Sequence, residues 1–249
     1  MKLPFFIAIT LLLFTFANTA AAKQKLVVGF GETLPPFVIS HTHSGLTIDI
    51  IKAALTPLGY QIEPRYYPYT RRAKGYIKGR IDVIADINLN TANGNLLNGY
   101  ISDEAYVYEN MAISLKSNNF NFTSIADLAN FSLISWPSAA IQLGEEYAKM
   151  AKANTQYYEV HDQSLQVKML FSNKADVIQM DKQSFDYYRS TLKGIDTTQP
   201  VDRFALFGKS PNGYLFKSKK LRDDFNLQLQ KLKNSGEYYK IFEKYKHAN

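Results

Sequence analysis

The sequence predicts an α/β fold with parallel strands, and two observations support this prediction. Along most of the chain, short continuous apolar runs alternate with segments whose apolar residues recur at helical spacing. Continuous apolar runs are typical of parallel strands that are buried on both faces, and the alternation is typical of βαβ units. The second observation is an internal repeat: the motif Asp-Val-Ile occurs at residues 82–84 and again at 176–178. In both copies a turn precedes the motif and a further aspartate follows it, which predicts two sheets whose ends face each other across a cleft.

The first half of the chain is expected to contain three extended segments and two helices. The apolar run at 26–30 predicts the first strand, and the helical spacing of the apolar residues at 46–55 predicts the first helix. Gly59 and Gly79 each follow a helical pattern and mark its end. The remaining elements expected here are an extended segment at 61–67, a helix at 71–78 and a strand at 82–85.

The second half repeats the alternation and ends in helices. Strands are expected at 131–136, 157–160 and 176–180, and helices at 139–153, 165–172 and 184–192. Near the C-terminus, two apolar stripes at helical spacing predict helices that pack on the core. The first stripe consists of Leu221, Phe225, Leu229 and Leu232, and the second of Tyr239, Phe242 and Tyr245.

The N-terminal segment has the pattern of a secretory signal peptide. Residues 1–22 carry one charge, at Lys2, followed by an apolar run too short to span a bilayer comfortably. Ala20 and Ala22 provide the small residues that precede signal-peptidase cleavage. We therefore expect a periplasmic protein of 249 − 22 = 227 residues, large enough for one large or two small domains. Its lack of cysteine excludes disulfides, thiolate metal sites and a lipid-bearing cysteine.

The charge pattern gives little support for a nucleic-acid partner. Lys and Arg outnumber Asp and Glu by 29 to 22, and ten basic against four acidic residues at 209–249 account for most of that excess. Scattered lysines on a terminal helix usually mark a solvated face, and export from the cytoplasm removes most nucleic acids as partners. We expect a monomer that binds no nucleic acid.

Three familiar kinds of functional motif are incomplete. Gly29 and Gly31 follow the first strand, but Leu34 replaces the third glycine that a dinucleotide-binding loop requires. His41 and His43 have no carboxylate or third histidine nearby in sequence, so a polar loop is expected there instead of a metal site. The remaining histidines suggest no Ser-His-Asp order, and no nucleophile elbow is present. We therefore expect no cofactor, no metal and no catalytic residue.

Candidate binding residues lie where strands end. Asp86 and Asp181 follow the two repeated strands, although an aspartate at such a position can also cap a turn or the next helix. Arg71 and Arg72 lie near the start of a helix, where a guanidinium group can meet an anion or pair with a surface acid. Tyr69 precedes them in an aromatic cluster, with stacking on a ligand and packing both open.

Two further candidates lie between a strand and the next helix. Trp136 is the only tryptophan of the chain, and it is expected at the same end of the second sheet. It can form an aromatic wall for a ligand or pack in the core. Ser138 can contact the ligand or act as the N-cap of the following helix.

The mature chain resembles the family 3 extracellular solute-binding proteins, the amino-acid-binding type of periplasmic binding protein. The resemblance lies in the order of several short segments: Pro35-Pro36-Phe37 after the first strand, 45–50, 79–82, Tyr106, 176–181 and 236–239. It implies a type II periplasmic binding protein, with two α/β lobes joined by two crossing segments and a ligand enclosed by hinge closure. The implied boundaries are 23–109 with 207–249 for lobe 1, and 110–206 for lobe 2.

The family's binding residues transfer unevenly to this sequence. Amino-acid binders of the family usually carry Thr-x-x-Arg after the first repeated strand, with the arginine on the ligand carboxylate. Here Thr91 fits, but Gly94 replaces the arginine. Asp181 matches the position that commonly holds the ligand amino group, and Arg72 falls in a helix start that faces the cleft in the family. The resemblance also brings in Phe37, for which ligand stacking and core packing remain alternatives.

We therefore expect a binding protein that captures a small polar, amine-bearing or amino-acid-like solute and presents it to an inner-membrane ABC permease. It is not expected to be an enzyme. The alternatives are a dehydratase-like enzyme on the same fold, which would need a general acid or base near its substrate, and a free ligand-sensing protein. The expected ligand-binding residues are Phe37, Tyr69, Arg72, Asp86, Trp136, Ser138 and Asp181.

Overall fold

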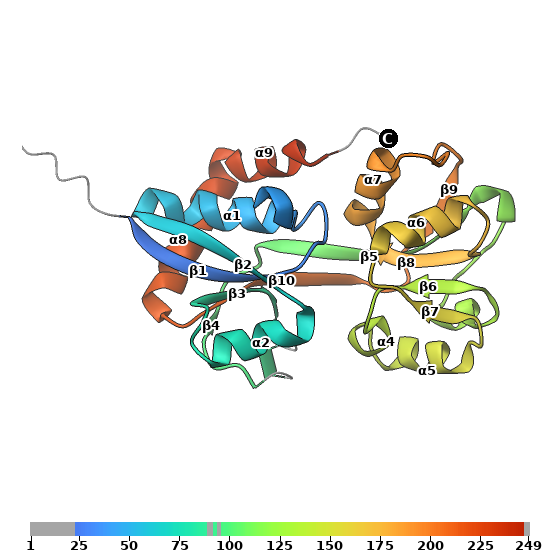
Figure 1. The fold of residues 1–249 in the computed structure, drawn as a ribbon, viewed down its shortest axis with the longest axis horizontal. Coiled ribbons are helices and arrows are strands. Elements are labelled where there is room, and N and C mark those ends of the chain that lie inside the picture. Colours follow the sequence, from blue (N-terminus) through green and yellow to red (C-terminus); the bar gives the residue numbers. More distant parts are fainter. Residues whose placement is uncertain (1–22, 89–91, 94–95, 247–249) are drawn as a thin grey trace, which may run out of the picture.

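The strands form two parallel groups joined by long antiparallel strands (Figure 1). The computed structural model describes residues 23–88, 92–93 and 96–246. Its strand order is β2-β1-β3-β10-β5-β8-β6-β7, and β4 and β9 pair with β10 and β5. The strands are β1 (Gln24–Gly31), β2 (Tyr60–Tyr67), β3 (Val83–Ile87), β4 (Tyr100–Ile101), β5 (Tyr106–Leu115), β6 (Leu133–Ser135), β7 (Tyr157–Glu159), β8 (Val177–Asp181), β9 (Val201–Phe204) and β10 (Lys209–Phe216).

The first lobe is built from both ends of the described chain. Its strand β1 pairs in parallel with β2 and β3. In Figure 1, α1 (Leu46–Leu55) and α9 (Glu237–Lys244) lie above these strands, α8 (Lys219–Ser235) runs upward behind them, and α2 (Tyr69–Ile77) lies below. The core beneath the upper helices includes Val28, Phe30, Ile48 and Phe225, none of which has exposed surface. Burial of these apolar side chains is the main force that holds the layers together.

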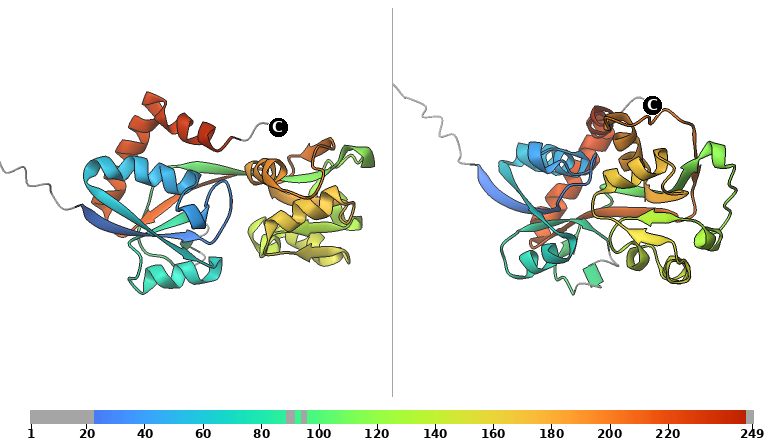
Figure 2. Two further views of the ribbon diagram at one scale, coloured as in Figure 1. Left: turned by 45° about the horizontal axis from the view of Figure 1, so that its top comes forward. Right: turned by 45° about the vertical axis from the view of Figure 1, so that its right-hand side comes forward.

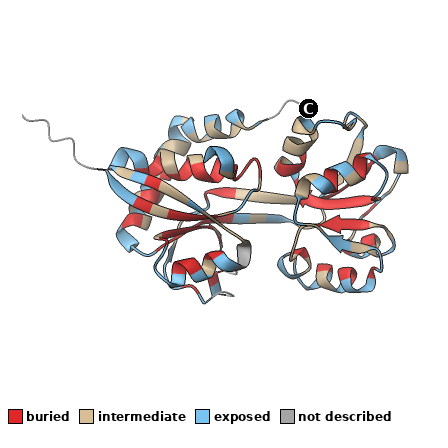
Figure 3. Cartoon of the chain, in the orientation of Figure 1, coloured by how far each residue is buried: buried red, intermediate tan, exposed pale blue. Residues whose placement is uncertain are grey.

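The second lobe repeats the arrangement. Strand β6 pairs in parallel with β7 and with β8. Figure 1 places α6 (Gln163–Phe171) and α7 (Lys182–Thr191) above the strands, and α4 (Ala139–Gln142) and α5 (Glu145–Ala153) below them. Each layer of helices covers its own apolar cluster, one around Leu133 and Tyr147 and the other around Ile178 and Phe185. Figure 3 shows the buried residues concentrated in the strands and on the inward sides of these helices.

Two strands cross from one lobe to the other. β5 and β10 pair antiparallel, with Glu109 opposite Lys209 and Tyr106 opposite Asn212. The rotated views in Figure 2 show that these strands span the space between the two lobes. This arrangement confirms the predicted α/β class with two lobes and two crossing segments. The exact division of the chain after residues 109 and 206 stays a prediction.

The internal repeat has a structural basis in both lobes. Asp82 Oδ2 accepts a hydrogen bond of 3.0 Å from the backbone N–H of Val27, which lies on the neighbouring strand β1. Asp176 Oδ2 accepts one of 2.9 Å from Ser132 N–H, directly before the neighbouring strand β6. In each lobe the first aspartate of the motif thus ties the start of its strand to the neighbouring parallel strand.

Three features differ from the sequence-based predictions. The helix expected at 139–153 is divided into α4 and α5, because Gly144 has a φ of +95° that a helix interior does not allow. Tyr239 is 62% exposed, so it does not belong to the core; Tyr238 packs there instead. The crossing strands are antiparallel to their neighbours, whereas only parallel sheets were expected.

Candidate functional site

Asp86 lies near the end of β3 and is held in a network of hydrogen bonds. Its Oδ1 accepts bonds of 2.7 Å from the hydroxyl groups of Tyr106 and Tyr108, both on the crossing strand β5. Its backbone N–H donates to the Tyr106 hydroxyl at 2.9 Å. The φ of Asp86 is +57°, a left-handed conformation that aspartate and asparagine tolerate better than most residues. The carboxylate is therefore fixed at the junction of β3 and β5.

Arg72 is the cationic partner of Asp86. Its Nη1 donates to Asp86 Oδ2 at 2.6 Å, and the two side chains are 3% and 15% exposed. Burial alone would raise the pKa of Asp86, but the Arg72 charge and the two tyrosine hydroxyls hold this pKa below its usual value. The structure thus brings together two predicted site residues as an internal ion pair. Arg71, the alternative at the same helix start, is exposed.

Asp181 ends β8 and caps α7. Its Oδ1 accepts from the backbone N–H groups of Gln183 and Ser184 at 2.8 and 3.1 Å, and its Oδ2 accepts from that of Glu109 at 2.8 Å. The residue is 6% exposed. Burial raises the pKa of Asp181 to about 7, although the three backbone donors favour the charged form. Within the described chain, all donors to this carboxylate are neutral backbone groups.

The two aspartates meet the crossing strand β5 at neighbouring positions. Asp86, from the first lobe, bonds the hydroxyl of Tyr108, and Asp181, from the second lobe, bonds the backbone of Glu109. That both carboxylates face the ligand stays a prediction. Because β5 joins the lobes, both carboxylates contact the connection between them.

Trp136 and Ser138 lie between β6 and α4. Trp136 is partly buried and packs against the lower apolar cluster of the second lobe. Ser138 adopts a left-handed φ of +71°, and its side chain makes no capping hydrogen bond to α4. The capping function predicted as its alternative is therefore wrong.

The carboxylate of Glu159 accepts hydrogen bonds from backbone N–H groups at the start of α4. This residue of β7 accepts from Ser138 N–H at 2.7 Å and from Ala140 N–H at 3.3 Å. Tyr157 donates a further hydrogen bond of 2.8 Å to the same carboxylate. Sequence reasoning missed Glu159, because its backbone partners at Ser138 and Ala140 lie about 20 residues away in the chain.

The other two predicted ligand contacts have different outcomes. Phe37 has no exposed surface, and its ring packs 4.4 Å from that of Tyr108, measured between centroids. In this conformation Phe37 is therefore part of the core of the first lobe, which was the alternative left open for it. The side chain of Tyr69 lies outside the described residues, as do Thr91 and Gly94.

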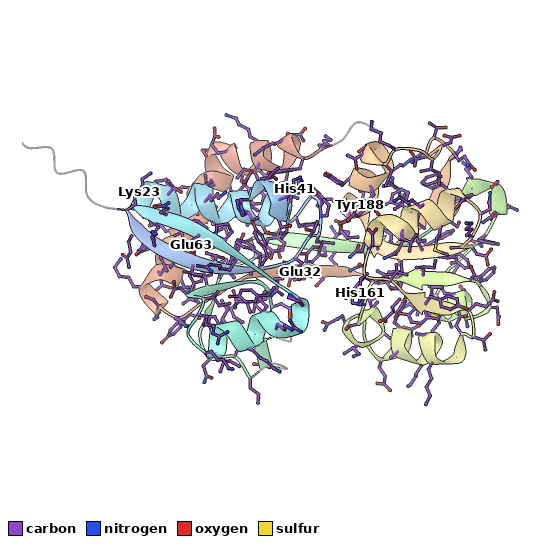
Figure 4. All side chains as sticks on the ribbon, in the orientation of Figure 1. Lys23, Glu32, His41, Glu63, His161 and Tyr188 are labelled. Atoms are coloured by element: carbon purple, nitrogen blue, oxygen red, sulfur yellow. The ribbon has the colours of Figure 1, made fainter. Side chains whose placement is uncertain are left out.

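A cavity of about 650 Å³ lies between the lobes. Its lining from the first lobe is Glu32, Thr33, Ser40, His41, His43 and Tyr66, and from the second lobe His161, Asp162, Gln163 and Tyr188. Figure 4 shows Glu32 and His41 on one side of the space between the lobes and His161 and Tyr188 on the other. None of the predicted contacts is among these residues. Three histidines in one cavity are a signal that sequence spacing does not reveal, because His161 is far from His41 and His43 along the chain.

The comparisons with known proteins agree with this two-lobed arrangement. The family model described as bacterial extracellular solute-binding proteins, family 3, matches residues 26–248. The comparison with curated proteins gave no match. No helix in the described ranges is long and apolar enough to cross a membrane.

Three solved structures illustrate the similarity in fold. An ancestral arginine-binding protein bound to arginine has a TM-score of 0.70 and 22% identity, covering 91% of this chain and 100% of its own. The amino acid ABC transporter substrate-binding protein AbpA from Streptococcus pneumoniae, bound to L-arginine, has a TM-score of 0.66 and 21% identity, with coverages of 90% and 94%. A histidine kinase sensor domain with similarity to periplasmic binding proteins has a TM-score of 0.70 and 15% identity, with coverages of 90% and 96%.

Proposed function

Because the chain belongs to the bacterial extracellular solute-binding proteins of family 3, we propose that it captures a small, polar, amine-bearing solute by closure of its two lobes. In this proposal the signal peptide is cleaved after Ala22 and the mature monomer works in the periplasm. It hands the solute to an inner-membrane ABC permease. No covalent bond of the solute changes, since the cycle consists of binding, closure and release.

The observation that carries the proposal is the environment of Asp181. Its carboxylate is 6% exposed and receives only neutral backbone donors within the described chain. A buried carboxylate without a cation is costly, and an ammonium group supplied by a solute would relieve that cost. Asp86 differs in this respect, because Arg72 already neutralises it. We therefore assign the solute amine to Asp181.

The same contacts favour an amine over an acidic solute. Arg72, the predicted partner for a solute carboxylate, is engaged with Asp86. The backbone donors at the start of α4 are engaged with Glu159. Glu32 and Asp162 place two acidic groups in the lining of the cavity between the lobes, which does not include Asp181. A cationic amino acid or a polyamine fits this charge distribution better than a dicarboxylic acid does.

A dehydratase-like enzyme on the same fold is the second candidate, and one observation favours it. The pKa of Asp181 is about 7, which is the range that suits a general acid or base at neutral pH. A free sensory protein is a third possibility, supported by the similarity in fold to a sensor domain. Both alternatives would use the same cleft as a binding protein. An enzyme would differ by changing the bound molecule chemically, and a sensory protein by the partner that responds to closure.

Calorimetric titration of the purified protein with cationic amino acids and polyamines, in the presence of EDTA, tests the proposal. We expect Asp181→Asn to keep the cap of α7, because asparagine is also a good N-cap, and to weaken binding of the best solute at least tenfold. The matched control is Asp224→Asn, which removes a carboxylate on α8 that pairs with Lys220. The control is expected to bind normally. Full affinity in Asp181→Asn would contradict the assignment, and chemical change of the bound solute would favour the enzyme.

A further inference from the structure

A row of polar side chains crosses the sheet of the second lobe at the carboxyl ends of its parallel strands. Ser135 is the last residue of β6, Gln179 lies near the end of β8, and both are fully buried. The Ser135 hydroxyl donates to Gln179 Oε1, and Gln179 Nε2 donates to Asn110 Oδ1 on the crossing strand β5 at 2.8 Å. Because buried polar groups are costly unless they are paired, these two bonds hold each member of the row in one orientation.

Asn110 is the last member of this row and is half-buried. Its Oδ1 accepts from Gln179, which lies opposite Ala112 and therefore deeper in the second lobe. The Nδ2 of the same planar amide thus points away from Gln179, back toward the boundary between the lobes. Within the residues that the structure describes, this Nδ2 donates to no protein acceptor. Asn110 therefore presents an oriented N–H donor at the lobe boundary.

Asp181 is the neighbour of Asn110 across the strand pair. The two residues lie directly opposite each other in the antiparallel ladder of β5 and β8. Opposite side chains emerge on one face of the sheet, with Cβ atoms about 4.5–5.5 Å apart. Tyr108 lies two residues before Asn110 on β5, and burial together with the charges of Asp86 and Asp181 raises its pKa well above the usual value. An acceptor, the Asp181 carboxylate, and a donor, the Asn110 amide, thus lie side by side where the lobes meet.

We propose that Asn110 binds the solute together with Asp181, by donating an amide N–H to an oxygen atom of the solute close to its amine. This inference rests on the proposed function, which assigns the amine to Asp181, and it narrows the class of solute. A plain polyamine has no oxygen acceptor, so closure around it would leave the Asn110 donor buried and unpaired. An amino acid, an amino-acid amide or an amino alcohol carries an oxygen on the carbon next to the one that bears the amine. Amines of this kind are therefore favoured over polyamines.

Two matched series of probes test the inference by calorimetric titration of the purified protein. One series is L-lysine, L-lysinamide and cadaverine, and the other is L-arginine, L-argininamide and agmatine. In each series the last probe keeps both cationic groups and lacks the oxygen. In at least one series, we expect the better of the two oxygen-bearing probes to bind the wild type at least tenfold more tightly than the oxygen-free probe.

Asn110→Asp is the decisive variant, because it keeps the acceptor for Gln179 and replaces the donor by a second oxygen. We expect it to bind the oxygen-bearing probe about tenfold more weakly and the oxygen-free probe equally or more tightly, so that the preference disappears. Gln179→Met removes the bond that orients Asn110. It is expected to reduce the preference at least threefold in the wild type and to add no further reduction to Asn110→Asp.

The matched control is Asn234→Asp. Asn234 lies on the exposed surface of α8, and its Oδ1 accepts a bond of 2.8 Å from Gln230 Nε2, the same kind of bond that Asn110 receives. The control is expected to keep the full preference. Circular dichroism checks that each variant is folded, and Asn110→Leu, which also lacks the donor, repeats the test if Asn110→Asp does not fold.

Two results would overturn the inference. One is a wild type that binds the oxygen-free probes as tightly as the others, or an Asn110 variant that keeps the preference. Capture of the amine at Asp181 would then stand without Asn110. The other is no saturable binding of any of the six probes below millimolar concentration, which would contradict the proposed function as well.

Discussion

Replacing Arg72 by methionine tests whether this arginine is an internal partner of Asp86 or a contact for the solute. The substitution keeps a long side chain and removes the charge. It leaves the Asp86 carboxylate 15% exposed, with the hydroxyl groups of Tyr106 and Tyr108 still donating to it. Removing one partner of a buried ion pair costs about 3–5 kcal/mol. For a chain of this size, that cost lowers the Tm by roughly 6–20 °C.

The double variant Arg72→Met/Asp86→Asn separates the pair from other effects. Asparagine tolerates the left-handed φ of +57° at position 86, so the backbone there need not change. Removing both charges eliminates the uncompensated carboxylate, and we expect the double variant to recover about 2 kcal/mol or more relative to Arg72→Met. Urea unfolding of the wild type, both single variants and the double variant, followed by circular dichroism, completes the cycle.

The opposite pattern would refute this reasoning. If Arg72→Met cost less than about 1 kcal/mol and abolished solute binding, Arg72 would be a ligand contact and the ion pair would be incidental. A coupling energy near zero between positions 72 and 86 would contradict the pair as well.

Three further predictions concern individual carboxylates. The pKa of Asp181 in the folded state, about 7, lies above its unfolded value. We therefore expect the free energy of unfolding to fall by at most about 4 kcal/mol as the pH rises from about 4 to 7. In Asp181→Asn, the urea midpoint should change less with pH over this range. The pKa of Asp86 is instead lowered, so its contribution to the free energy of unfolding is present above about pH 4 and lost below it. The stability of Asp86→Asn should therefore depend less on pH in the acid range. Glu159→Ala should lower the free energy of unfolding by about 1 kcal/mol, measured as a lower urea midpoint with an unchanged m-value. An unchanged midpoint would contradict a stabilising effect of the hydrogen bonds from Ser138 and Ala140.

Much of the fold could be predicted from the sequence, because parallel strands and their helices leave strong local patterns. The repeat at 82–84 and 176–178 was informative for a physical reason: each first aspartate bonds the backbone next to a parallel neighbour. The break between α4 and α5 was not predicted, because the residues on both sides of Gly144 continue the same helical spacing. The crossing strand β10 was not predicted, because the apolar residues of its segment, Lys209–Phe216, follow neither a helical nor an alternating pattern.

The candidate site was harder to predict, because its chemistry depends on pairs that are distant in sequence. Arg72 and Asp86 were both selected from their positions, but sequence alone does not reveal that they neutralise each other. Phe37 has an aromatic side chain beside the cleft loops and nevertheless packs fully inside the lobe. His161 and His41 line the same cavity only because the two lobes face each other, and sequence spacing does not reveal this.

The most direct test of solute capture is a thermal-shift screen of the purified protein in EDTA against amino acids, polyamines, small peptides and organic acids, with Trp136 fluorescence as a second signal. A thousandfold excess of a tight solute adds about 4 kcal/mol, which raises the Tm by roughly 8–16 °C. We predict that an amine-bearing solute gives a shift of this size. A comparable shift with organic acids alone, or no shift with any amine-bearing solute, would contradict the account.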